Sequence, residues 1–140
     1  MTASNVVRDG LRAALPAAVF SGLPSTLYAW ARSRDPLEAT VAAGSILLPR
    51  ESRRVRLLAA AAPVHIALSV AWSIVLAAVL PRRNPLVEGS IAGLALAGVD
   101  LGFIGQRYPR IRELDMAPQV ADHVAFGIIV AVMLSSREVD

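Results

Sequence analysis

The fold class of this chain is decided by Leu57-Leu-Ala-Ala-Ala-Ala-Pro-Val-His-Ile-Ala-Leu-Ser-Val-Ala-Trp-Ser-Ile-Val-Leu-Ala-Ala-Val-Leu80. These 24 consecutive residues include no Asp, Glu, Lys or Arg. A helix rises about 1.5 Å per residue, so the segment would be about 36 Å long and could cross a hydrocarbon core of about 30 Å. It therefore predicts a membrane-spanning helix.

The composition supports a membrane protein. The chain has 140 residues, of which 55% are hydrophobic and 18% are charged, whereas soluble domains average about 45–50% apolar and about 25% charged residues. The lack of cysteine excludes disulfides and thiolate chemistry. The net charge of +3 comes from arginines without interleaved aromatic residues, which favours contact with anionic lipid headgroups over nucleic-acid binding.

The pattern of apolar runs predicts an all-α fold, an integral membrane four-helix bundle in a single domain covering residues 1–140. The expected spans are residues 11–31, 55–80, 86–106 and 118–135. Between the first two spans, Asp35-Pro-Leu-Glu38 has the composition of a helix N-terminus, with Asp35 as the N-cap and Glu38 at the third helical position. It predicts a short interfacial helix over residues 35–48, which is too short to cross a bilayer.

The first span contains Ser21-Gly-Leu-Pro-Ser-Thr26, which predicts a helix break formed by Pro24, Ser21 and Ser25. Proline lacks a backbone N–H, and in lipid each freed carbonyl must find another donor. The break is either a packing kink or a functional interruption, as in the half-helices of transporters. Pro16 and Pro24 interrupt the apolar run and therefore disfavour a cleaved signal peptide ending at Ala29-Trp-Ala31.

The third span contains two small-xxx-small pairs, Gly89/Gly93 and Gly98/Gly102. Such pairs let helix backbones approach closely in lipid. The third span is therefore predicted to be tightly packed, either within the bundle or in a homodimer.

A few polar residues interrupt the apolar spans, and their depths coincide. The candidates are His65, Ser69, Asp100, Asp122 and His123. At about 1.5 Å per residue, the Asp and His residues lie roughly 8–14 Å inside the same end of their spans, and Ser69 follows His65 by four residues on the same helix face. Ionisable groups at this depth face the bundle interior and pair with one another. We expect His65 to face His123 or Asp122, with Asp100 close by.

Several functions are compatible with this polar layer. It could hold or gate the bundle through hydrogen bonds, either in the protein alone or in an accessory subunit of a larger membrane complex. It could carry protons, ions or solutes in a small transporter. His65 and His123 could also hold haem b as a bis-histidine anchor, and the two His and two Asp residues together could ligate a metal ion. No catalytic motif is present, so no enzyme activity, catalytic residue or resident metal is predicted.

Arginine counting predicts the orientation and location. In a four-span topology, nine of the 14 arginines lie on the side of residues 32–56 and 107–112, and five lie with the termini. The positive-inside rule then places both termini outside, in a multi-pass protein of the plasma (inner) membrane.

Five segments together resemble small uncharacterised four-span membrane proteins of high-GC bacteria. They are Ser21–Thr26, Arg34–Glu38, the His65…Ser69…Trp72 span, the Asp100 span and Pro118–Gly127. More loosely, His65 in span two and His123-Val-Ala-Phe-Gly127 in the last span are similar to YagU-like inner-membrane proteins. The resemblance implies a membrane location and importance for the two histidines, and supplies no activity.

Overall fold

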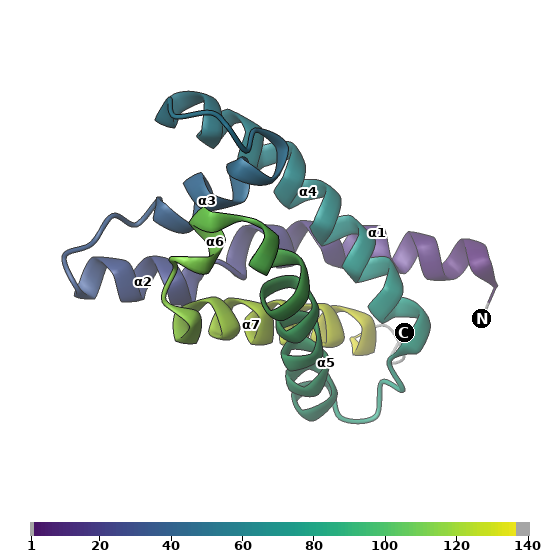
Figure 1. Ribbon diagram of the computed structural model, residues 1–140. Coiled ribbons are helices and arrows are strands. Elements are labelled where there is room, and N and C mark those ends of the chain that lie inside the picture. Colours follow the sequence, from purple (N-terminus) through teal and green to yellow (C-terminus); the bar gives the residue numbers. More distant parts are fainter. Residues whose placement is uncertain (1, 137–140) are drawn as a thin grey trace.

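The computed structural model describes residues 2–136, and the regular elements of this part of the chain are all helices, without strands (Figure 1). The elements, in chain order, are α1 (Ala3–Phe20), α2 (Leu23–Ala31), α3 (Glu38–Leu47), α4 (Arg54–Val79), α5 (Pro85–Val99), η1 (Asp100–Ile104), η2 (Gly105–Arg107), α6 (Pro109–Arg112) and α7 (Met116–Ser135).

Three helical segments of the described chain are long and apolar enough to cross a membrane: Arg54–Val79, Pro85–Arg107 and Met116–Ser135. The second combines α5, η1 and η2 in one continuous segment. They correspond to the predicted spans 55–80, 86–106 and 118–135. Large apolar side chains cover the outside of these helices, including Ile66, Ile91 and Phe103, each more than half exposed. Exposed apolar surface on long apolar helices indicates a membrane protein.

The predicted span 11–31 does not form one continuous helix. α1 ends at Phe20 and α2 begins at Leu23, so the interruption lies just before Pro24. Pro24 is in the first turn of α2, where its missing N–H costs no helical hydrogen bond. Figure 1 shows α1 and α2 following one another along one side of the molecule. α1 is not among the three long apolar helices, because it contains the charged residues Arg8, Asp9 and Arg12.

The helix predicted over residues 35–48 is α3, which is shorter and begins at Glu38. Asp35 accepts the backbone N–H of Leu37 at 3.0 Å, which forms a turn before the helix. Its carboxylate also binds the guanidinium of Arg54, with Nη2 to Oδ1 at 2.8 Å. The expected N-cap therefore serves a different purpose: it ties the start of α3 to the start of α4.

α7 is the central helix, because α1, α2, α4 and α5 all pack against it. Its closest approach is to α5, where a Cβ built on Gly93 would lie 2.6 Å from the Cα of Val124. Gly89 approaches Ile128 in the same way, and Gly127 faces both α5 glycines. Of the four glycines expected to pack, Gly89 and Gly93 therefore face α7. The other two, Gly98 and Gly102, have nothing within 4 Å of a built Cβ.

The apolar core lies where α1, α4, α5 and α7 meet, towards the end of the molecule away from α2 and α3. Its members are Ala13, Ala17, Leu76, Ala77, Leu96, Phe126, Val130 and Leu134. Several of them are alanines, which lets these helices pack closely. Towards α2 and α3, in contrast, the packing gives way to a cavity.

Alanine substitution of two glycines in α5 tests the packing. Gly93→Ala should lower the free energy of unfolding by about 1–3 kcal/mol, because the new methyl group would overlap the α7 backbone. Gly98→Ala should be neutral or raise it by up to about 1 kcal/mol, because alanine favours the helix and its Cβ meets open space. Thermal unfolding in detergent measures both. Equal effects of the two variants would contradict the α5–α7 interface.

The Asp35–Arg54 pair predicts a pH dependence outside the membrane spans. Hydrogen bonds from Arg54 and from the Leu37 N–H lower the pKa of Asp35 from 3.8 to about 2. Because the folded pKa is depressed, the stabilisation is complete above pH 3.8 and is lost as the pH falls through about 2. The carboxyl-carbon NMR shift of Asp35 should titrate accordingly. Arg54→Gln should move the midpoint towards 3.8, whereas Arg53→Gln should leave it unchanged.

Candidate functional site

A cavity of about 420 Å³ lies between α4, η1 and α7. It exists because α4 packs on α3, α1 and α7 but hardly contacts α5. Its polar lining residues are Ser21, His65, Ser69, Trp72, Asp100, Gln119, Asp122 and His123. All five residues of the predicted polar layer therefore line one space. The remaining lining is apolar and includes Val64, Leu68, Leu96, Ile104 and Phe126.

One polar contact supplies a hydrogen-bond donor to the C-terminal end of α1. The Nε2 of His65 lies 2.7 Å from the backbone oxygen of Ala18. In an uninterrupted helix, that oxygen would accept the N–H of Gly22, four residues later. The helix ends before Gly22, and His65 of α4 supplies a donor instead. Since a carbonyl can only accept, the proton is on Nε2 of the imidazole.

A second contact supplies a hydrogen-bond acceptor to the N-terminal end of α2. Asp122 of α7 accepts the backbone N–H of Ser25 at 2.8 Å, where α2 has an unpaired donor in its first turn. The carboxylate also lies at the positive end of the α2 dipole, and the His65 donor lies at the negative end of α1. The two ends of the broken helix are therefore held by side chains of complementary polarity from two other helices.

The break also has local partners. The backbone oxygen of Gly22 accepts the hydroxyl groups of Ser25 at 3.3 Å and Thr26 at 2.8 Å. Ser21 is buried and lines the cavity beside the break. The Gly22 oxygen also accepts the backbone N–H of Thr26 at 3.2 Å, so the two hydroxyls add to a helical hydrogen bond at the start of α2.

Asp100, Trp72 and His123 form a separate network on the other side of the cavity. Asp100 Oδ2 accepts the indole N–H of Trp72 at 3.0 Å and lies 3.4 Å from Nε2 of His123. The other imidazole nitrogen, Nδ1, is 2.8 Å from the backbone oxygen of Gln119. Because that oxygen only accepts, Nδ1 carries a proton, and a hydrogen bond between Nε2 and Oδ2 requires one further proton. The His123–Asp100 pair is thus arranged to share a single proton.

Asp100 is positioned by an irregular turn. It begins η1, a π-helical segment in which the N–H of Gly105 bonds to the Asp100 carbonyl. A π-turn places one extra residue in the helix and occurs frequently at functional sites. Oδ1 of Asp100 is buried, and it has no hydrogen-bond partner among the described residues. The sequence predicted an ordinary helix here and did not indicate the π-turn.

The structure corrects the expected pairing of His65. We predicted that it faces His123 or Asp122, but among the described residues its hydrogen bond is to the Ala18 backbone instead. The reason is that a carbonyl freed at the helix break needs a donor, and His65 lies opposite it. His123 is paired with Asp100, and Asp122 with the break. Ser69 is buried on the cavity wall, one helical turn after His65.

Three groups that contact the polar layer were not part of the prediction: the indole of Trp72 and the backbone oxygens of Ala18 and Gln119. Trp72 continues the His65–Ser69 face of α4, so its spacing was a usable signal. The backbone oxygens of Ala18 and Gln119 leave no mark in a sequence, because every residue type has a carbonyl group.

The geometry does not point to a bound metal or haem. No group of three or more His, Cys, Asp or Glu residues in the described chain is arranged to hold a metal ion. Each imidazole binds a backbone oxygen through one nitrogen, and Nε2 of His123 lies beside Asp100. A bis-histidine haem would have to replace the His123–Asp100 contact or the contacts to the backbone.

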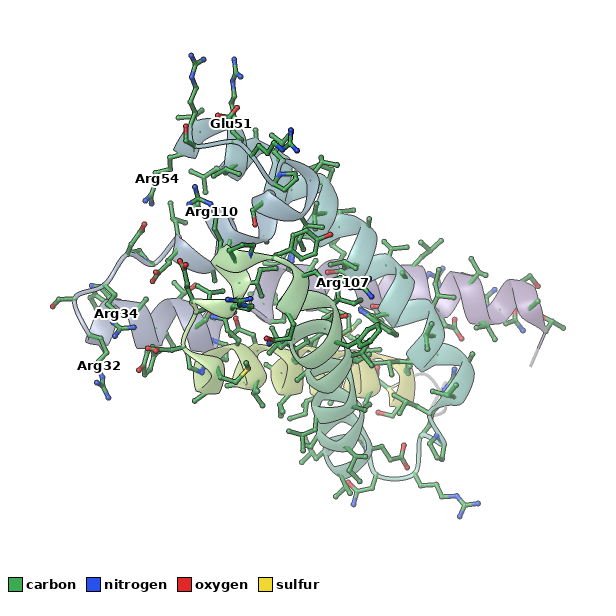
Figure 2. The ribbon with its side chains drawn as sticks, in the orientation of Figure 1. Arg32, Arg34, Glu51, Arg54, Arg107 and Arg110 are labelled. Carbon is green, nitrogen blue, oxygen red and sulfur yellow. The ribbon has the colours of Figure 1, made fainter. Side chains whose placement is uncertain are left out.

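Several arginines lie at the end of the molecule that holds the C-terminus of α2 and the N-terminus of α4. They do not line the cavity. Figure 2 shows Arg32, Arg34, Arg54 and Arg110 at this end. Several are paired: Arg34 and the Tyr28 hydroxyl both bind Asp115. The backbone N–H of Arg53 and the Arg56 guanidinium lower the pKa of Glu51. Arg137, counted for orientation, lies outside the described residues.

Comparison of the chain with protein-family models, with curated proteins and with solved structures finds no match. The function is therefore argued from the site.

Two substitutions of His65 test its contact with the helix break. His65→Phe should lower the free energy of unfolding by about 1–3 kcal/mol, because it leaves the Ala18 carbonyl without a donor. His65→Gln should lower it less, because the amide N–H can donate to the same oxygen. Thermal unfolding in detergent distinguishes them. A glutamine variant no more stable than the phenylalanine variant would show that the hydrogen bond is not what His65 contributes.

Proposed function

We propose that this protein is a small, non-enzymatic, multi-pass protein of the inner membrane, whose His/Asp layer has two tasks. His65 and Asp122 hold the bundle together by satisfying the broken first helix. Asp100 and His123 carry a proton at the wall of the cavity, as in a small transporter or proton-conducting protein. The observation that carries the second role is the His123–Asp100 contact, whose hydrogen bond requires one shared proton.

In the proposed topology, α1 and α2 together form the fourth membrane crossing, and α3 lies at the interface. Three observations support it. The two half-helices run along the same side of the molecule (Figure 1). Their break is satisfied by groups from two spanning helices, which is what backbone in lipid requires. Four of the five arginines labelled in Figure 2 lie towards one end, as on the cytoplasmic side of an inner-membrane protein, and Arg107 lies nearer the middle.

Proton transfer in this site needs little movement. In one state His123 is an imidazolium and Asp100 a carboxylate. In the other, the Nε2–H bond has broken, an Oδ2–H bond has formed, and both groups are neutral. Trp72 donates to the same oxygen and stabilises the carboxylate form. Intramembrane Asp and His residues that face a cavity commonly form such relays, and broken helices and π-turns recur at transport sites.

Proton movement across liposomes tests this function. Protein reconstituted in liposomes with a trapped pH dye should collapse an imposed pH gradient faster than protein-free liposomes. Asp100→Asn should reduce the rate at least tenfold, because an amide cannot take up the proton. Glu113→Gln, which removes an exposed carboxylate in the turn between α6 and α7, should have no effect.

A result in which wild type and Asp100→Asn collapse the gradient at the same rate would reject proton transfer through this pair. The polar layer would then retain its packing role alone.

A further inference from the structure

We propose that the cavity is a binding site for a small apolar organic monocation, whose positive charge pairs with the carboxylate of Asp122. This inference rests on the proposed role of the cavity and adds a ligand class to it. The volume of about 420 Å³ suits a compact aromatic or aliphatic ligand, since small-molecule sites usually measure about 300–1,000 Å³.

The charge of the lining points to a cation. The cavity is lined by two carboxylates and two imidazoles, and by no arginine. Asp100 and His123 form a neutral pair when they share one proton. His65 donates through Nε2 to a backbone oxygen and needs no second proton. Asp122 is the remaining acidic residue of the lining. Among the described residues, no basic side chain lies within salt-bridge distance of it.

The unused hydrogen-bonding capacity of the Asp122 carboxylate also favours a ligand that is a cation or a hydrogen-bond donor. The donors found at the Asp122 carboxylate come from one residue, Ser25, through its backbone N–H at 2.8 Å and its nearby hydroxyl. A carboxylate has room for several donors. Asp122 is half-buried, and a carboxylate removed from water without a counter-charge is costly in a membrane. A cation in the cavity would remove that cost, whereas an anion would increase it.

The walls suit an apolar cation better than a hydrated inorganic ion. Val64, Leu68, Leu96 and Ile104 are aliphatic, and Trp72 and Phe126 are aromatic. Aromatic faces attract organic cations through the ring quadrupole. A metal ion would instead need several oxygen ligands, and no such group is arranged in the described residues.

Trp72 provides a direct readout of occupancy. It lines the cavity, while the other tryptophan, Trp30, is 75% exposed on α2. In a Trp30→Phe background, N-benzylpyridinium is a suitable probe, because it is an apolar monocation and its pyridinium ring quenches indole fluorescence. The protein should be kept in a maltoside detergent, whose headgroup carries no charge.

N-benzylpyridinium should quench Trp72 saturably. Its neutral isostere diphenylmethane and the anion benzylsulfonate should not displace it. Asp122→Asn should weaken binding at least tenfold while its amide oxygen still accepts the Ser25 N–H, and Glu113→Gln should bind as wild type. Ala67→Phe, which fills the cavity from α4, should abolish quenching even if Asp122→Asn fails to fold.

Two competitors distinguish the source of the cation. Displacement by benzyltrimethylammonium indicates a free solute, and displacement only by dihexanoylphosphatidylcholine indicates a lipid headgroup; both support a cation site. Displacement by diphenylmethane or benzylsulfonate, or unchanged binding to Asp122→Asn, would overturn the proposal. Binding in detergent does not depend on proton flux, so this experiment can succeed where the gradient assay fails, and the reverse.

Discussion

The structure depends on how the backbone of a broken helix is satisfied by side chains of two other helices. Between Phe20 and Leu23 the backbone leaves helical geometry, so the end of α1 lacks donors and the start of α2 lacks acceptors. In water, solvent would supply both. Within a hydrocarbon layer the partners must come from the protein. His65 and Asp122 provide them from α4 and α7, which fixes how these two helices stand relative to the first.

This constraint explains the cavity. His65 and Asp122 are directed towards the break, and the close glycine contacts pull α5 onto α7 rather than onto α4. α4 and η1 therefore stand apart, and the space between them is bridged mainly by the long side chain of Trp72, which reaches Asp100. The polar groups that hold the fold together are thus the same groups that line the space.

The two networks differ in what they can do. The groups at the break bind backbone atoms, and the contact with the Ala18 oxygen places a proton on Nε2 of His65. The Asp100–His123 contact joins two groups that can each hold or release a proton. We therefore propose different roles for these groups, proton transfer for Asp100 and His123 and ligand binding for Asp122.

The sequence by itself determined that the chain is helical and apolar enough for a membrane, because a long run without charges, such as Leu57 to Leu80, has few alternatives. It also placed the polar residues at a common depth, since helical rise converts residue number into distance. The partners of each polar group were decided only by the tertiary structure. His65 binds a backbone carbonyl, and Asp100 sits on a π-turn, because both depend on which helices become neighbours and where their backbones are left unpaired. Backbone atoms are alike at every position, so no residue pattern could reveal those contacts before the helices were packed.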